Sequence, residues 1–202
     1  MTKQAITALI AVILTIVGVG AGVAWASSNS ASTANAPSGN DIEPFTFEIA
    51  ENATRFAFDD APVFDDGMPA YGNPFVTQGY IYEQATLADG GGVNPDGSPT
   101  HPEAVIGTWI CEGVLIGDGA RTVSGPWVVS TQVFDFDAFD GFDAVVTHGV
   151  ETPVVGEPVE RAVIGGTGSH AGAAGKQIQA LEGFNGSGGV NLTVTLIPEN
   201  GS

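Results

Sequence analysis

A glycine-rich segment, residues 162–176 with the sequence AVIGGTGSHAGAAGK, is the part of the chain that most resembles a phosphate-binding loop. The dinucleotide fingerprint requires Gly-x-Gly-x-x-Gly, and here Gly166, Gly168 and Gly172 are one residue too far apart. The P-loop pattern fails as well, because Gln177 stands where that motif requires Ser or Thr. Both motifs also need a following helix, for which the sequence leaves little room before the next glycine. We therefore expect no nucleotide site.

An acidic segment, residues 135–143 with the sequence DFDAFDGFD, approaches the spacing of a calcium loop. It carries one residue too many between its acidic positions, and it lacks the glutamate that closes such a loop. The alternative to a calcium site is an acidic loop whose aromatic side chains cap one end of the fold. These aromatic residues are Phe134, Phe136, Phe139 and Phe142.

The histidines and the cysteine predict neither a metal site nor a disulfide. His101, His148 and His170 show no H-x-H or H-x-x-x-H spacing. Cys111 is the only cysteine of the chain, which excludes an internal disulfide. It lies in a strand-like stretch, where we interpret it as a small buried hydrophobic residue.

The charge of the chain restricts its partners. The sequence has 23 Asp and Glu against 5 Lys and Arg, and its formal net charge is −18. Because phosphate binding requires a basic surface, nucleic acid is excluded as a partner.

Residues 1–26 predict export from the cytoplasm as a signal peptide. The segment is apolar after Lys3 and ends in Ala24-Trp-Ala26, an A-x-A cleavage pattern. The apolar run is close to the about 20 residues that span a bilayer, so an uncleaved membrane anchor is the alternative. In both cases we expect the globular part to be secreted or at the cell surface. Residues 27–43 are small and polar, which predicts a disordered tether before a single domain at 44–198.

From Phe45 onward, apolar residues recur with period two, and Gly, Pro, Asn and Asp interrupt the chain at short intervals. This pattern predicts strands at 45–49, 75–83, 105–116, 122–131, 144–148, 159–164, 173–182 and 190–197. Most connections are too short for helical crossovers, so the strands are expected to be antiparallel. A closed barrel is favoured over a sandwich because closure removes exposed edges.

Three segments resemble the allene oxide cyclase and dirigent protein superfamily. They are VIGTWIC at 105–111, TVSGPW at 122–127 and AVIGGTGSHAGAAG at 162–175. In that superfamily a similar glycine-rich hairpin joins two late strands of an eight-stranded antiparallel β-barrel. The resemblance implies the same all-β barrel here, with the glycines at a strand-to-strand corner where positive φ angles are needed. Members of the superfamily often assemble as trimers or dimers, which implies a homo-oligomer.

The resemblance also implies that the mouth of the barrel holds a hydrophobic small molecule. Allene oxide cyclases close an unsaturated fatty-acid epoxide into a cyclopentenone, and dirigent proteins steer the coupling or cyclisation of phenolic intermediates. Neither uses a cofactor. The expected activity is therefore a cofactor-free cyclisation or isomerisation, and the alternative is a non-catalytic binding or structural module outside the cell.

Two glutamates are the catalytic candidates that the resemblance implies. FEIAE at 47–51 is similar to the cyclase segment YEINE, whose first glutamate is linked to catalysis, and this places Glu48 in that role. Glu83 is the nearest acidic match to a functional Asn or Asp of the family. A carboxylate inside an apolar barrel would have a raised pKa and could move a proton. Period two leaves open whether Glu48 and Glu83 face the lumen or the solvent.

Four further residues are candidates for contacting the ligand. Cys111 matches a pocket cysteine of the cyclases, and Trp127 matches the aromatic residue of the family's G-P-Y/F segment. Trp109 lies in VIGTWIC, and Tyr82 lies in YIYE at 80–83, which resembles the family strand whose acidic match is Glu83. No metal ligand is expected among them.

Overall fold

The computed structural model describes residues 43–136 and 143–199. The predicted export segment and the tether up to residue 42 lie outside the described residues, as do Phe139 and Phe142 of the acidic segment. No helix in the described part of the chain is long and apolar enough to cross a membrane.

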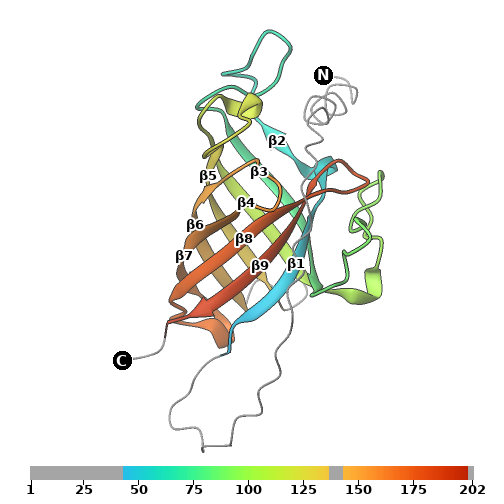
Figure 1. Cartoon of the computed structure of the whole chain (residues 1–202), viewed down its shortest axis with the longest axis vertical. Helices are drawn as coiled ribbons and strands as arrows, with labels where there is room; N and C mark the ends of the chain where they lie inside the picture. Colours follow the sequence, from blue (N-terminus) through green and yellow to red (C-terminus); the bar gives the residue numbers. More distant parts are fainter. Residues whose placement is uncertain (1–42, 137–142, 200–202) are drawn as a thin grey trace, which may run out of the picture.

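The described chain is built almost entirely from strands (Figure 1). The strands are β1 (Phe45–Glu51), β2 (Ala57–Phe58), β3 (Pro74–Glu83), β4 (Val105–Leu115), β5 (Val128–Asp135), β6 (Ala144–Glu151), β7 (Pro158–Gly166), β8 (Gly175–Phe184) and β9 (Val190–Pro198). Four 3-10 turns lie between them: η1 (Ala53–Arg55), η2 (Pro102–Ala104), η3 (Gly119–Arg121) and η4 (Gly168–His170).

The sheet is closed into a barrel. Its order is β1-β9-β8-β7-β6-β5-β4-β3, and β1 also pairs with β3, with Ile49 opposite Ile81. Every strand pair in this sheet is antiparallel. The short β2 adds to the start of β3 outside the closed ring. The prediction of an eight-stranded antiparallel barrel is therefore confirmed.

One predicted strand was placed too early. The stretch 122–131 was expected to be extended throughout, but the strand β5 begins only at Val128. Before it, the Thr122 hydroxyl accepts a hydrogen bond from the Asp118 N–H and donates one to the Gly119 carbonyl, both at 2.8 Å. These local bonds offer the backbone an alternative to the sheet, which hydrophobic patterning alone does not reveal.

Apolar side chains fill the half of the barrel where β1 begins. Phe47, Ile49, Ile81 and Phe134 are fully buried there. The Phe47 ring lies 5.3 Å from that of Phe134 and 5.5 Å from that of Phe136, in edge-on contacts. Aromatic residues at the border of the acidic segment therefore cap this end of the barrel.

The glycine-rich hairpin is a barrel corner between β7 and β8. Gly168 has a φ of 59°, which confirms the positive φ expected at this corner. At Gly166, an added Cβ would collide with the backbone oxygens of His170 and Ala144. Gly165 has open space around it and no positive φ.

Candidate active site

A cavity lies inside the barrel at the end where β1, β4, β6 and β8 finish. Its volume is about 110 Å³. One water molecule needs roughly 10–15 Å³, so the cavity is large enough for a single organic ring. Most of its wall is apolar or aromatic: Ala53, Phe56, Pro69, Phe75, Leu115, Ala120, Trp127, Val128, Phe184 and Val190. The remaining lining residues are Glu51, Thr77, Trp109, Cys111, Glu151 and Gly188. The cavity thus combines an apolar wall with two carboxyl groups.

Strand alternation explains why these two glutamates face inward. On β1 the side chains of Phe47, Ile49 and Glu51 share one face, and the first two fill the barrel core. On β6 the same alternation places Glu151 on the face of Val145 and Thr147, both buried. Each glutamate ends its strand, so each lies at the cavity and not in the closed half of the barrel.

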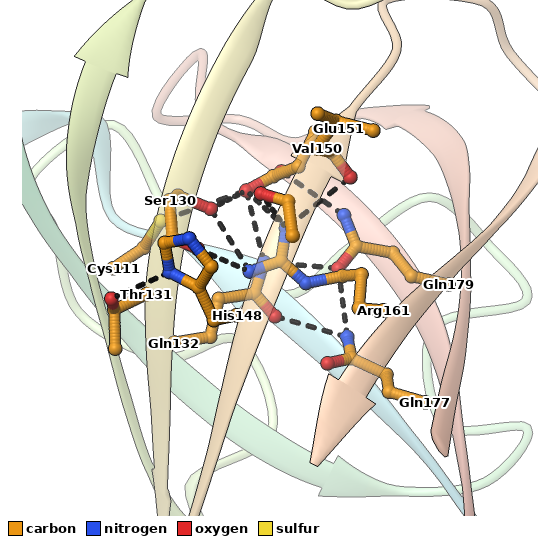
Figure 2. Close-up of polar contacts among 11 residues, drawn as sticks. Cys111, Ser130, Thr131, Gln132, His148, Val150, Glu151, Arg161, Gln177 and Gln179 are labelled. Carbon is orange, nitrogen blue, oxygen red and sulfur yellow. Dashed lines mark hydrogen bonds and ion pairs between the residues drawn. The ribbon is translucent and has the colours of Figure 1, made fainter. Parts of the chain in front are cut away.

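Glu151 accepts hydrogen bonds at both carboxylate oxygens (Figure 2). Oε1 accepts from Ser130 Oγ at 2.5 Å and from Gln132 Nε2 at 3.1 Å. Oε2 accepts from Gln179 Nε2 at 3.0 Å, and Arg161 Nη1 lies 3.3 Å from Oε1. These donors and the guanidinium stabilise a negative charge on Glu151 although the residue is only 8% exposed.

Arg161, on β7, is the cation that balances this charge. The residue is 2% exposed. Its Nη2 donates to the carbonyl and the hydroxyl of Ser130 at 2.9 and 3.0 Å, and its Nη1 also reaches the carbonyls of Gly149 and Val150. Gly149 leaves room for the arginine, because a Cβ there would lie 3.0 Å from the Arg161 Cγ. Arg161 of β7 is therefore bonded to both β5 and β6.

A layer of three glutamines continues this network deeper into the barrel. Gln132 donates to Gln179 at 2.9 Å, and Gln177 donates to Gln132 at 3.0 Å and to Gln179 at 2.9 Å. All three side chains are buried. Figure 2 shows this cluster extending from Glu151 across the strands that carry Arg161 and the glutamines. The side chains of this polar network thus come from β5, β6, β7 and β8.

Glu51 has a different environment from Glu151. Its Oε2 accepts one hydrogen bond from the Val190 N–H at 3.0 Å, and the residue is 8% exposed. None of the ion pairs among the described residues includes Glu51. Burial raises the pKa of this carboxyl against the opposing effect of the Val190 bond, and the charge of Glu151 raises it further. The two glutamates therefore form an unequal pair, with a charge-balanced Glu151 beside a Glu51 whose pKa is raised.

Cys111 lies between this polar cluster and the apolar wall. Its Sγ donates to Glu151 Oε1 at 3.7 Å. Burial, together with the neighbouring Glu151 charge, raises the pKa of the thiol well above its ordinary value. Since the thiolate is the reactive form, this cysteine contributes a weakly polar wall and not a nucleophile.

The two predicted catalytic glutamates lie away from the cavity. Glu48 is on the outer face of β1, where its Oε2 accepts a hydrogen bond from the Leu87 N–H at 2.7 Å. Glu83 ends β3 and is exposed. The structure brings neither of them into the barrel, and the site described here does not include them.

Three of the four predicted ligand contacts do line the cavity, namely Trp109, Cys111 and Trp127. Tyr82 does not, because it is buried against the outside of the barrel wall. There its hydroxyl donates to the Gly92 carbonyl at 2.5 Å, beneath the segment that joins β3 to β4. This burial raises the pKa of Tyr82 to about 12.

The sequence reasoning missed Glu51, Glu151 and Arg161. Glu51 lies in the same FEIAE segment as Glu48, three residues further on. A signal for Arg161 did exist, because it is one of only 5 basic residues and stands between Val159 and Val163 in an alternating strand. A lone arginine on the inward face of such a strand implies a buried acidic partner.

Among the described residues, no group of three or more His, Cys, Asp and Glu could hold a metal ion. The acidic segment considered for calcium lies partly outside the described residues. The candidate site is therefore an organic-ligand site with two carboxyl groups.

No protein-family model matches the sequence, and no curated protein matches it either. Solved structures with a similar fold include a pyocyanin demethylase, with 12% identity and a TM-score of 0.49 over 78% of this chain and 100% of that one. They also include a pterocarpan synthase dirigent protein, with 11% identity and a TM-score of 0.48 over 85% of this chain and 96% of that one. The second belongs to the superfamily that the glycine-rich hairpin resembles. At these identities the comparison concerns the fold alone.

Proposed function

We propose that the barrel binds a small, largely apolar molecule in the cavity and that Glu51 exchanges a proton with it. The observation that carries this proposal is a buried carboxyl group, with no ion-pair partner among the described residues, at the wall of an apolar cavity. Large apolar pockets with a few converging polar groups and perturbed pKa values are typical of binding and active sites. Here the aromatic residues supply the apolar wall, and Glu51 supplies the titrating group.

The chemistry that fits this pair is a proton-transfer isomerisation or cyclisation. Protonated Glu51 gives its proton to an oxygen or a double bond of the ligand, which becomes cationic. The Glu51 carboxylate then removes a proton from another atom of the same ligand, so the ligand keeps its composition. Burial and the neighbouring Glu151, whose charge Arg161 balances, raise the pKa of Glu51 and so favour the protonated acid that begins the reaction.

Binding is tested by thermal denaturation of the full-length protein in the presence of ethylbenzene or acetophenone, two one-ring molecules. A ligand that binds only the folded state raises the melting temperature in a saturable way. Val190→Phe should abolish this effect because it fills the cavity, while Val76→Phe, on the exposed outer face, should preserve it. Absence of stabilisation by both ligands would overturn the proposal.

Proton transfer is tested with 3-cyclohexenone, whose isomerisation to the conjugated 2-cyclohexenone is followed by ultraviolet absorbance. We expect the protein to accelerate this reaction and Glu51→Gln to reduce the acceleration by about 100-fold, the lower range for a general acid–base group. Glu48→Gln is the matched control, because its carboxylate lies on the outer face. Equal rates for the wild type and Glu51→Gln would refute the catalytic part of the proposal and leave binding intact.

Export of the chain is a separate proposal that rests on residues 1–26. It predicts that the mature protein begins at Ser27. N-terminal sequencing of protein collected outside the cytoplasm tests it. A chain that still begins at Met1 in a membrane fraction would favour the anchor instead.

A further inference from the structure

Two tryptophans in the cavity wall have indole N–H groups without a hydrogen-bond partner. Trp109 Nε1 and Trp127 Nε1 are both buried, and neither has an acceptor among the described residues. Both residues line the cavity that holds Glu51. Buried polar groups are nearly always paired in proteins, and an indole N–H is a donor only. The third polar atom of the cavity wall without a partner among the described residues is Thr77 Oγ1, a hydroxyl that can also donate. The hydrogen-bond partner that all three groups lack in common is therefore an acceptor.

An anionic ligand does not fit this wall. The lining residues include two glutamates and no Lys, Arg or His. Arg161 lies behind Glu151, and its guanidinium is already bonded to Glu151, Ser130 and backbone carbonyls. The chain as a whole carries a formal charge of −18, which repels anions.

A cationic ligand also fits less well than a neutral one. Both oxygens of Glu151 already accept hydrogen bonds from the protein. Glu51 would have to be ionised to pair with a cation, and burial opposes its ionisation. The titratable and charged groups that influence Glu51 or share its wall are Cys111 on β4, Glu151 on β6 and, behind it, Arg161 on β7. The indole N–H groups of Trp109 and Trp127 are donors only, so they offer a cationic ligand no acceptor.

We propose that the ligand is a neutral, mainly apolar molecule with an acceptor oxygen, such as a cyclic ketone or a quinone. Its oxygen receives a hydrogen bond from the indole N–H groups of Trp109 and Trp127, and its hydrocarbon part occupies the aromatic cavity. This inference rests on the proposed function, since it specifies the ligand of the same cavity. Protonated Glu51 adds a further donor next to the bound oxygen.

The test compares four one-ring ligands of similar size that differ in their polar group: acetophenone, ethylbenzene, 1-phenylethylamine and benzoate. Uniformly ¹⁵N-labelled full-length protein is titrated with each at pH 6 while the indole N–H resonances of its three tryptophans are recorded. Trp25→Phe and Trp127→Phe assign two of these resonances, and the third then belongs to Trp109. The buried Trp109 therefore does not need to be replaced.

We expect acetophenone to bind at least 10-fold more tightly than 1-phenylethylamine and benzoate, and to move the Trp109 or Trp127 indole proton downfield. Ethylbenzene should bind without this downfield shift. Tightest binding of the amine or the benzoate, or acetophenone binding with both indole resonances unchanged, would overturn the inference and leave the proposed function standing. Failure of all four ligands to bind would overturn the proposed function as well.

Discussion

The buried ion pair between Arg161 and Glu151 makes a sharp prediction about stability. Replacing Arg161 by Met keeps much of the side-chain volume but removes every guanidinium bond to Ser130, Gly149, Val150 and Glu151. It leaves a carboxylate that is 8% exposed with no cation beside it. Breaking a buried pair from one side costs about 3–5 kcal/mol. We expect Arg161→Met to lower the free energy of unfolding at pH 7 by this amount.

Glu151→Gln should cost about as much, because it leaves the guanidinium of Arg161 buried without an anion. The double variant loses both charges together. Its remaining cost is that of the arginine bonds to three backbone carbonyls, at about 1 kcal/mol each. The double variant should therefore be destabilised by about 3 kcal/mol, far less than the sum of the single changes.

The assay is urea denaturation of the wild type and the three variants, followed by tryptophan fluorescence and circular dichroism. A double-mutant cycle then gives the coupling free energy, which we expect to be about 3 kcal/mol or more. Where a single variant fails to refold, the double variant and Glu151→Gln still give a comparison with the wild type. Additive losses, or a double variant less stable than either single variant, would refute the reasoning that charge balance holds this layer together.

The remaining predictions concern the hairpin, the unequal glutamate and the cysteine. Gly166→Ala should destabilise the barrel by about 1–3 kcal/mol through backbone collisions, while Gly165→Ala, in open space, should change stability by less than about 0.5 kcal/mol in the same denaturation assay. Because the pKa of Glu51 is raised in the folded state, the wild type should lose stability relative to Glu51→Gln as pH rises from the ordinary glutamate range through the folded pKa, by at most about 1.4 kcal/mol per pH unit. A stability difference independent of pH would contradict the burial of an ionisable Glu51. Cys111 should react with a thiol reagent at pH 8 at least about 100-fold more slowly in the native protein than in guanidinium chloride, because its thiol is buried and its pKa is raised; comparable rates would show that the cavity admits the reagent.

The strands were predictable because period-two alternation is a local property of the sequence. The eight-stranded barrel and the glycine corner between β7 and β8 were expected from the resemblance of the glycine-rich segment to the superfamily hairpin. Positive φ at Gly168 and the absence of room for a side chain at Gly166 are properties of a tight turn that sequence reports directly. The start of β5 was misplaced where Thr122 forms its own turn, which is also local but is not visible in hydrophobic patterning.

The identity of the inward glutamates was decided by tertiary structure. FEIAE offers Glu48 on one face of β1 and Glu51 on the other, and a shift of one residue exchanges lumen and solvent. The pattern of apolar residues in the sequence could not distinguish the two faces of β1. The segment between β3 and β4 covers the outside of the barrel wall there, so apolar residues are buried on both faces. Ala50 and Tyr82 are fully buried there, although they point away from the lumen.

Pairing of β1 with both β3 and β9 fixes which face of β1 looks inward, and this pairing joins residues far apart in the chain. The same closure brings Arg161 of β7 to Glu151 of β6 and to Ser130 of β5. The sequence by itself determined that strands form, alternate and turn at the glycines. Only closure of the barrel decided which polar side chains share the cavity. The sequence of a strand does not show which of its two faces points inward until the neighbouring strands bury one of them.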